Sequence, residues 1–544
     1  MKRVANLILA SVIIVSTTSC ASRIYNRSPE ARGSGAELSA DTTNSTTDSA
    51  TTDDGRDVRS ADIPRHPSRI EFPELDWEIP LGASYRQQLS TGMVTYIAED
   101  HELPYAKVGG YIKTGSILDP AGKEGLGDLY ARMLRTGGTE MFAPDTLDEL
   151  VERLAIDIGF SVKETNMQFS ASYLSEYSDT ALLVLRQMLF SPRFDENKLE
   201  KEKAIMIQQI RHRFDNPEPV LSVAYQQTFY PEQPNSRLST IESVGSITVE
   251  DLKNYHNQVM FAANMIVSAS GDFEKEEMEK YLQSFESKEQ KQPVFPEIHH
   301  NPNVKATFVH KDINQAYVRM GLPIFSRPHP DYYPVSMLNL ILGGGGFSSR
   351  LATRIRSDEG LTYSIYSNAG SNYTYPDTWY INFFTSQQTT NKAIAYILQE
   401  IRRLLKDGVT DEEMENARKV LIDGLPSMFR SPGDIVETYA FNEYIGRDEN
   451  HFRVYPEKLH AITREDIMRV ADTYLKPDSL TYTIVGDSTA LLNQQAVDGF
   501  SIGELSPMKL ISDAELVATP QTPQTPATQS PQKTRQRKKS GSYE

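Results

Sequence analysis

The chain of 544 residues contains a single cysteine, Cys20. One cysteine excludes an intrachain disulfide framework and a thiolate metal cluster. Basic residues are fewer than acidic ones, and the formal net charge is -17. Contacts to phosphate require Lys and Arg, so this balance argues against a nucleic-acid-binding protein. After the first twenty residues, no apolar run is long enough to cross a membrane.

The first twenty residues, MKRVANLILASVIIVSTTSC, have the parts of a secretory signal. Lys2 and Arg3 precede an apolar run over residues 4–15, and small residues follow up to Cys20. This order is typical of a segment that is removed from the mature protein. We therefore expect a signal peptide over residues 1–19.

Cys20 follows Thr-Thr-Ser and resembles the lipobox of bacterial lipoproteins, in which the cysteine is acylated and becomes the mature N-terminus. The box is imperfect because threonine replaces the usual leucine, and the alternative is a plain signal peptide with an incidental cysteine. Ala21 follows, without the aspartate that resembles an inner-membrane retention signal. We expect a lipid anchor in the outer membrane of a bacterial cell envelope, facing the periplasm.

Two segments at the ends of the chain lack the composition of a packed domain. Residues 20–75 are rich in Ser, Thr, Asp, Ala and Gly, which predicts a disordered tether. Residues 496–544 are predicted to be a disordered tail that becomes rich in Pro, Thr and Gln and closes on a basic cluster at 533–539. That cluster is either a contact for anionic surfaces or a solvated tail.

The sequence between these segments contains an internal repeat. SITVEDLKNYHNQVMFAANMIVSASGDF starts at Ser246, and AITREDIMRVADTYLKPDSLTYTIVGDS starts at Ala461. Thr248 corresponds to Thr463 and Gly271 to Gly486, a constant offset of 215 residues. Each copy predicts a helix with a threonine N-cap and acids in its first turn, followed by a strand that ends in Gly-Asp.

The repeat predicts two homologous units, at 76–275 and 304–495, joined by a connector at 276–303. Both begin with β-branched and aromatic runs, which predict strands, and continue with helical patterns. The fold class is therefore α+β, with two α/β sandwich units that each pack helices on an antiparallel-rich sheet. The predicted helices are 145–158 and 194–214 in the first unit, and 333–342, 390–406, 410–424 and 432–445 in the second.

In the first unit, the stretch GLGDLYARML predicts an amphipathic helix. Its apolar residues fall at helical spacing and form one buried stripe, which consists of Leu126, Leu129, Tyr130, Met133 and Leu134. Asp128 and Arg132 lie four residues apart on another face. Their simplest interpretation is an exposed ion pair worth about 0.2–0.5 kcal/mol.

The longer stretch GSILDPAGKEGLGDLYARMLRTGGT resembles the pitrilysin/insulinase family of zinc metallopeptidases, which includes the mitochondrial processing peptidase and bacterial relatives. Further matching pieces are LFSPRFDENKLEKEKAIMIQQI, PNSRLSTIESVGSIT, LNLILGGGGFSSRLATRIRSDEGLTYSIYS and VTDEEMENARKVLI. The resemblance extends over residues 80–490 and so covers both units.

The resemblance also implies what is missing. Active members carry the inverted motif His-x-x-Glu-His on this helix, where two imidazoles hold zinc and the glutamate activates water. Here those positions hold Asp128, Ala131 and Arg132, and the later helix offers Gln208 or Gln209 where a ligating glutamate belongs. The ten histidines include no His-x-x-x-His pair, and His299-His300 is interpreted as a surface feature of the connector. We therefore expect no metal and no cofactor in this chain.

The second unit keeps its part of the pattern. Residues 343–346 are four glycines without a following Gly-Lys-Ser/Thr, so we expect a tight turn that feeds a helix capped by Ser348 or Ser349. In the family, an Arg and a Tyr seven residues later bind the substrate carbonyl opposite the zinc. Arg356 and Tyr363 match that pair. The alternative is that Arg356 pairs with a nearby acid such as Asp358 and that Tyr363 is a strand core residue.

The resemblance implies a division of labour between two chains. This chain would be the non-catalytic, substrate-binding subunit of a two-chain peptidase and form half of a clam-shell chamber for unfolded peptides. A homologous subunit would bear the zinc, and Arg356 and Tyr363 would act on the peptide in trans. The alternatives are a catalytically inert scaffold or peptide-binding protein of the cell envelope, and an autonomous peptidase.

Overall fold

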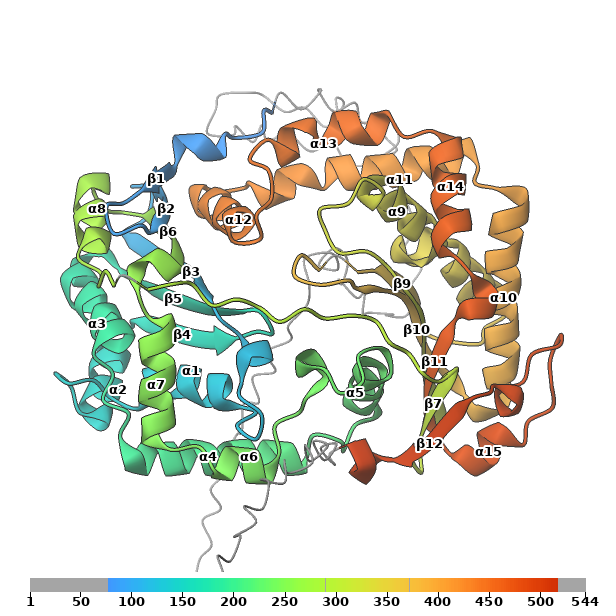
Figure 1. The fold of residues 1–544 in the computed structure, drawn as a ribbon. Coiled ribbons are helices and arrows are strands. Elements are labelled where there is room, and N and C mark those ends of the chain that lie inside the picture. Colours follow the sequence, from blue (N-terminus) through green and yellow to red (C-terminus); the bar gives the residue numbers. More distant parts are fainter. Residues whose placement is uncertain (1–76, 289, 371, 517–544) are drawn as a thin grey trace, which may run out of the picture. The chain divides into compact units, whose positions relative to one another are not determined.

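The computed structural model describes residues 77–288, 290–370 and 372–516 (Figure 1). The predicted signal peptide at 1–19, the lipidation site Cys20 and the tether at 20–75 lie outside the described residues. The same holds for the tail from 517 on, with its basic cluster. In the described part of the chain, no helix has both the length and the hydropathy that crossing a bilayer requires.

The first unit is built on a six-stranded sheet in the order β1-β2-β6-β3-β5-β4. All neighbouring pairs are antiparallel except β2 and β6, which run parallel. The strands are β1 (Arg86–Gln88), β2 (Val94–Glu99), β3 (Tyr105–Lys113), β4 (Asp157–Val162), β5 (Asn166–Leu174) and β6 (Met265–Gly271).

Helices cover one face of this sheet and enclose the first hydrophobic core (Figure 1). The core combines alternate sheet residues such as Val108 and Ile112 with apolar helix faces such as that of Leu185 and Leu189, all fully buried. The helices of this unit are α1 (Leu126–Thr136), α2 (Pro144–Arg153), α3 (Ser178–Phe190), α4 (Glu196–Arg211), α6 (Ile241–Gly245), α7 (Val249–Val259) and α8 (Lys275–Gln283).

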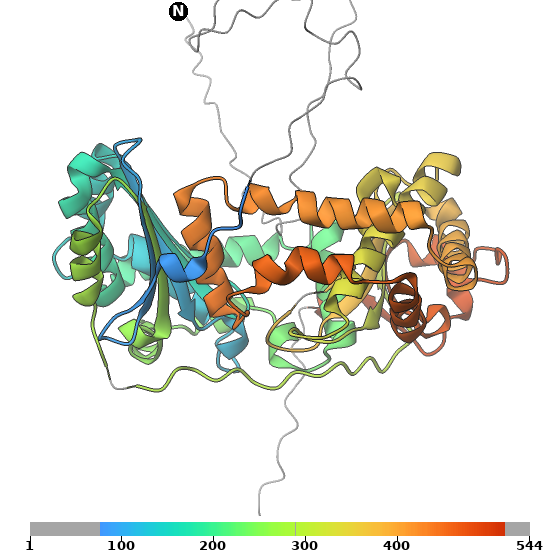
Figure 2. The ribbon, with the colours of Figure 1, turned by 90° about the horizontal axis from the view of Figure 1, so that it is seen from above.

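The second unit repeats this plan with the strand order β12-β7-β11-β8-β10-β9. Its strands are β7 (Ala306–His310), β8 (Gln315–Pro323), β9 (Ile365–Ala369), β10 (Thr378–Ser386), β11 (Thr481–Gly486) and β12 (Met508–Ser512). Its helices are α9 (Tyr332–Asn339), α10 (Thr390–Asp407), α11 (Asp411–Asp423), α13 (His451–His460), α14 (Arg464–Tyr474) and α15 (Ser488–Leu492). Residues 290–304 join the units as a segment without helix or strand (Figure 2).

The structure confirms that the two units are homologous. Strands β2, β6, β3, β5 and β4 have the same neighbours and directions as β7, β11, β8, β10 and β9. The repeated threonines cap equivalent helices: Thr248 accepts from the backbone of Asp251, and Thr463 accepts from that of Asp466. The α+β prediction and the sheet-plus-helices plan are therefore correct.

The two units exchange one helix each, so that each of these helices packs on the sheet of the other unit. Helix α5 (Pro217–Phe229) contacts β7, β8 and β11 of the second sheet, and α12 (Pro432–Tyr444) contacts β2, β3 and β6 of the first (Figure 1). Both begin with proline, and they are separated by the repeat offset of 215 residues. Each unit thus supplies one helix to the other unit's sheet, on the side opposite to that sheet's own helices.

Three predicted boundaries are corrected by the structure. Residues 496–516 are not disordered, because β12 pairs in parallel with β7 and the side chains of Ile502 and Ile511 are buried. The helix predicted to reach residue 158 ends at Arg153, since Ala155 adopts a left-handed φ of 51° and the chain then enters β4. Part of the predicted connector, up to Gln283, is helix α8.

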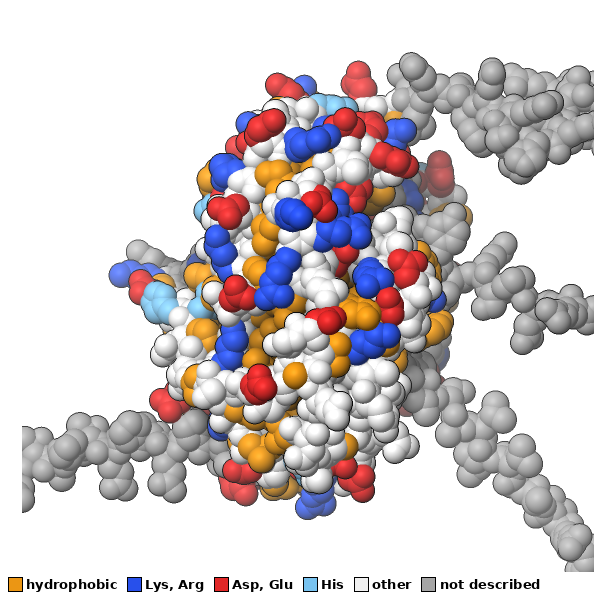
Figure 3. All heavy atoms as spheres, turned by 90° about the vertical axis from the view of Figure 1, so that its right-hand side faces the viewer, with side chains coloured by type: hydrophobic (Ala, Val, Ile, Leu, Met, Phe, Trp, Pro, Cys, Tyr) orange, Lys and Arg blue, Asp and Glu red, His pale blue; other side chains and the backbone are white. Residues whose placement is uncertain are grey.

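Acidic, basic and hydrophobic side chains are interspersed on the face of the molecule seen in Figure 3. No continuous basic surface of the kind that binds a nucleic-acid backbone is visible on that face.

Candidate functional site

Helix α1 carries the first group of candidate residues and is fixed at its N-terminus by a buried carboxylate. Gly125 has a left-handed φ of 98°, and the Asp119 side chain accepts hydrogen bonds from the backbone of Gly125 at 2.8 Å and of Gly127 at 3.0 Å. These bonds satisfy donors that a helix start leaves free. The predicted apolar stripe is buried, and it consists of Leu126, Leu129, Tyr130, Met133 and Leu134.

Arg132 pairs with helix α4 rather than with Asp128. Its Nη2 donates to Oε1 of Gln209 at 2.8 Å, and its Nη1 lies 3.5 Å from Oε2 of Glu202. Nε2 of Gln208 instead lies 2.7 Å from Nε2 of His212. The contact between α1 and α4 that the resemblance implies is therefore present, and Gln209 is the residue that meets Arg132.

The Asp128 carboxyl lies among three cations. Asp128 is exposed, although neighbouring protein atoms partly desolvate its carboxyl. This burial raises the pKa of Asp128, and the charges of Arg132, Lys163 and Arg213 oppose the rise. Arg213 is held in place because it donates to Ser239, at 3.0 Å to the carbonyl and 2.7 Å to the hydroxyl.

This set of residues does not fit zinc. Asp128 offers one oxygen ligand, whereas a guanidinium cannot ligate a metal and its fixed charge repels one. Ala131 is buried and has no group that activates water. The amide of Gln209 is neutral and already accepts from Arg132. The positions of the family's motif therefore form an Arg–Gln–Glu contact in place of a metal centre.

One other group of residues in the described part of the chain has ligand atoms close enough together for an ion. The three carboxylates of Glu99, Glu274 and Glu276 lie close enough together to share an ion, but all three are exposed and none belongs to α1 or α4. His299 is exposed, as predicted. His300 is half-buried: its Nε2 lies 3.2 Å from the Tyr230 hydroxyl, and burial lowers its pKa.

Arg356 and Tyr363 lie side by side in the second unit. The tight turn predicted over 343–346 begins only at Gly345, because Gly343 and Gly344 belong to the π-helical segment η7 (Leu340–Gly344). A helix then starts after Ser349, whose hydroxyl accepts from the backbone of Ala352 at 3.4 Å, and continues as the π-helical segment η9 (Ala352–Asp358). The Arg356 Cζ lies 5.1 Å from the centroid of the Tyr363 ring. The chain turns at Gly360, with φ 61°, between the two residues.

Both alternatives for this pair are contradicted by the structure. Tyr363 is 77% exposed and precedes β9, so it is not a core residue of a strand. Arg356 forms no ion pair with Asp358 or with any other residue from 77 to 516 that the structure describes. Its neighbour Arg354, by contrast, pairs with Glu359 at 2.8 Å.

Phe347 is a third residue of this group and was not predicted from the sequence. Phe347 is 72% exposed, and its ring centroid lies 4.0 Å from the Arg356 Cζ, so the guanidinium contacts two exposed aromatic rings. Its position directly after four glycines is the only sequence signal for it. Asp128, Arg132 and Gln209 form one group and Phe347, Arg356 and Tyr363 another, and no contact joins the two among the described residues.

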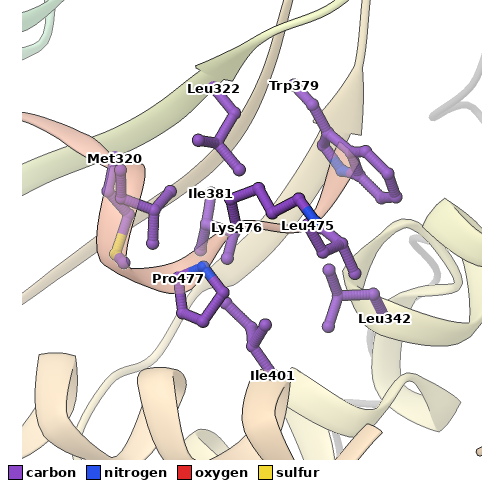
Figure 4. Close-up of a pocket in the computed structure, with 10 residues that line it drawn as sticks. Met320, Leu322, Leu342, Trp379, Ile381, Ile401, Leu475, Lys476 and Pro477 are labelled. Atoms are coloured by element: carbon purple, nitrogen blue, oxygen red, sulfur yellow. The ribbon is translucent and has the colours of Figure 1, made fainter. Parts of the chain in front are cut away.

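An internal cavity of the second unit lies apart from both groups (Figure 4). Its lining is apolar apart from Lys476, and it includes Met320, Leu322, Trp379 and Ile401 of the hydrophobic core. None of the candidate residues lines this cavity, so it is part of the core and not of a functional site.

Comparisons with known proteins identify the family. The description "Insulinase (Peptidase family M16)" matches residues 94–240, and "Peptidase M16 inactive domain" matches residues 246–421, together more than half of the chain. The chain belongs to the M16 peptidase family. The resemblance drawn from the sequence is thereby confirmed, and this M16 protein is a member in which the zinc-motif positions hold Asp128, Ala131 and Arg132.

Three proteins of known sequence or structure are similar to most of this chain. The "Non-peptidase homolog YmxG" of Helicobacter pylori is 26% identical over 410 residues, which cover 74% of this chain and 94% of that protein. The crystal structure of a peptidase M16 inactive domain from Pseudomonas fluorescens superposes with a TM-score of 0.68 at 21% identity, covering 76% of this chain and 99% of that one. A chain in the structure of Complex III2 from Candida albicans has a TM-score of 0.60 at 15% identity, covering 74% and 95%.

Proposed function

We propose that this protein is the non-catalytic, substrate-binding subunit of a two-chain zinc peptidase. One observation carries the proposal: Arg356 and Tyr363 are adjacent, accessible and without a carboxylate partner among the described residues, while the zinc positions of the same chain are filled by Arg132 and Gln209. The chain would supply its two donors to a peptide held at the zinc of a homologous subunit.

The chemistry of the pair supports this role. When water attacks a peptide bond, negative charge develops on the carbonyl oxygen, and donors already directed at that oxygen stabilise it. A guanidinium and a phenol are such donors. The rings of Phe347 and Tyr363 orient the Arg356 guanidinium, and none of its N–H groups has an acceptor among the residues that the structure describes.

The proposal includes a location. A lipid at Cys20 would hold the protein at the outer membrane, where the periplasm offers unfolded peptides and a secreted zinc-bearing partner. Radiolabelled palmitate incorporation that is lost in Cys20→Ser tests this part separately from the peptidase part.

The test of the proposed function is a reconstitution. The chain is co-purified with the zinc-bearing homologue of its own genome, and cleavage of an unfolded fluorogenic peptide is measured. Arg356→Ala and Tyr363→Phe should each lower kcat/KM by about 100-fold or more, the range expected for loss of a donor to an oxyanion. Zinc content of the complex should not change, because the zinc ligands lie in the partner.

Arg354→Ala is the matched control. Arg354 lies two residues from Arg356 in the same π-helical segment, but it already pairs with Glu359. We expect this variant to keep full activity in the complex. The proposal fails if the mixture is no more active than the partner alone, or if Arg356→Ala and Arg354→Ala behave alike.

The second candidate is an inert scaffold. The structural likeness to a chain of Complex III2 favours it, since that protein lies in a multisubunit assembly. Native mass spectrometry separates the candidates. A homodimer, or an assembly without a zinc-bearing M16 chain, supports the scaffold and argues against the proposed peptidase subunit.

A further inference from the structure

A second group of unpaired donors lies elsewhere in the second unit, where the start of α9, the loop between β9 and β10, and the end of α12 meet. We call it the paired-arginine cluster: Arg327, Arg447, Tyr332, Tyr373 and Asn442. The Arg327 Cζ lies 3.4 Å from the ring centroid of Tyr332 and 4.6 Å from that of Tyr373. Arg447 donates to the Tyr373 hydroxyl through Nε at 2.8 Å and Nη2 at 2.7 Å.

The cluster holds two positive charges and no negative one. Arg327 is only 8% exposed, and burial together with the charge of Arg447 lowers its pKa. Neither arginine pairs with a carboxylate anywhere in the described part of the chain. The neighbouring His451 adds no charge, because burial and both arginines lower its pKa to about 3.

Among the described residues, the other buried acidic, lysine and arginine side chains all have a partner. Arg319 pairs with Glu218, Lys203 with Glu200, Glu400 with Arg350, Asp331 with Arg469, Glu124 with Arg237, and Asp119 accepts two backbone hydrogen bonds. Burying an unpaired charge is costly. Cation–π contacts return about 0.5–2 kcal/mol, which offsets only part of that cost.

A second donor in the cluster also lacks an acceptor. The Asn442 side chain is 3% exposed, its Oδ1 accepts from Nη1 of Arg447 at 2.9 Å, and its Nδ2 is buried without a partner. The bond from Arg447 fixes which end of the amide is the oxygen, since a guanidinium only donates. Within residues 77–516, as far as the structure describes them, the guanidinium of Arg327 and the Nδ2 of Asn442 are thus both donors without acceptors.

We propose that the paired-arginine cluster binds an oxyanion, a carboxylate or a phosphate group. The planar guanidinium of Arg327 would hold two oxygens at once, Arg447 would add charge, and Nδ2 of Asn442 would donate a further bond. Tyr332, Tyr373 and Arg447 keep part of their surface exposed, so the cluster borders solvent. The rings of Tyr332 and Tyr373 against Arg327 lower the local dielectric constant and strengthen the interaction.

The test measures anion binding by the full chain. Calorimetry and thermal unfolding are done with inorganic phosphate, with sodium chloride at the same ionic strength as the reference. A peptide with a free C-terminal carboxylate is compared with its amidated form to separate a carboxylate ligand from phosphate. We expect saturable binding of phosphate or of the free-carboxylate peptide, a raised Tm, and about tenfold weaker binding in Arg327→Gln.

Two further variants keep the test decisive. Arg327→Lys keeps the charge but not the fork, and its binding should also weaken, whereas Arg354→Gln, at an arginine already paired with Glu359, should bind as the wild type does. Without added anion, Arg327→Gln should melt no earlier than the wild type, because it removes an unpaired buried charge. The proposal is overturned if neither probe binds, if Arg327→Gln binds as tightly as the wild type, or if that variant loses Tm equally with and without anion.

Discussion

The two units have the same strand neighbours, yet their candidate sites are in opposite states. In the first unit, Arg132 on the regular helix α1 is engaged by Gln209 and Glu202. In the second unit, Arg356 lies on a π-helical segment, and its guanidinium lies against the rings of Phe347 and Tyr363. Donors that are already satisfied cannot serve a substrate, whereas free donors can. The two units thus share a framework, and of these two residue groups the one in the second unit keeps its arginine without a carboxylate partner among the described residues.

The backbone of the two groups also differs: it is regular in the first unit and irregular in the second. The helix after the first unit's strand β3 is α1, a regular helix of 11 residues. The corresponding helix of the second unit, α9, continues into the π-helical segment η7 (Leu340–Gly344), and the glycine turn and η9 follow. Wide turns of this kind cost backbone hydrogen-bond geometry and are found mostly at functional sites. The irregular backbone coincides with the open site.

The largest predicted change in the free energy of unfolding concerns the buried side chains of α5 and α12, the helices that the two units exchange. Phe229 of α5 is fully buried against Tyr225, at a ring-centroid distance of 4.6 Å, whereas Phe441 of α12 is 38% exposed. Phe229→Ala should lower the free energy of unfolding by about 3–5 kcal/mol, because it removes a ring and leaves a cavity. Phe441→Ala should cost about 1 kcal/mol or less. Denaturant unfolding measures both, and equal losses would show that the two exchanged helices do not differ in this way.

A pH experiment tests the contact between the units. Glu164 of the first unit accepts a hydrogen bond from the Tyr375 hydroxyl of the second, and burial raises the pKa of Glu164 to about 7. The ordinary value is 4.5, so the contribution to stability is present below about pH 4.5 and is lost as the pH rises through about 7. We expect a loss of about 1–3 kcal/mol over this window.

Glu164→Gln should flatten that part of the pH profile of unfolding. A residual slope of the same sign should remain, since burial also raises the pKa of Asp119, inside the first unit, to about 7. Glu412→Gln, at an exposed position on α11, is the control and should leave the profile unchanged. A profile that Glu164→Gln does not alter would contradict the assigned cause.

Local patterns allowed the sequence to predict much of this fold. The capped helices at Thr248 and Thr463, the α1 stripe and the adjacency of Arg356 and Tyr363 follow from short-range spacing and from the family resemblance. Helix α5 was missed because it packs on more than one side, so its sequence PEPVLSVAYQQTF lacks an amphipathic period. Strand β12 was missed because its pairing with β7 joins segments about two hundred residues apart.

The candidate site was less predictable than the fold, for a related reason. The sequence left Gln208 and Gln209 equivalent, and only the packing of α4 on α1 turns Gln209 toward Arg132. Arg327 resembled any arginine in a loop before a helix. Arg327 lacks a carboxylate partner because none of the segments that meet around it supplies one within the described residues. No local sequence pattern reveals such an absence.

The smallest predicted change in the free energy of unfolding concerns the ion pairs that helices α5 and α12 make with the opposite sheets. Glu218 of α5 pairs with Arg319 of β8 at 3.0 Å, and Glu437 of α12 pairs with Lys107 of β3 at 2.5 Å. Only 11% of the Arg319 side chain is exposed, whereas both members of the other pair are partly solvated. Glu218→Gln should therefore cost about 1–2 kcal/mol, because Arg319 stays buried with a weaker partner.

Glu437→Gln should cost less than about 0.5 kcal/mol, since exposed ion pairs are screened by water and salt. The two substitutions are chemically identical, which makes them matched controls for each other in urea unfolding. Raising the salt concentration should shrink the Glu437 effect further and leave most of the Glu218 effect. If both variants lose the same stability, or both losses vanish in salt, the burial of Arg319 does not set the strength of its pair. The contact that α5 makes with the second sheet would then depend on its apolar side chains alone.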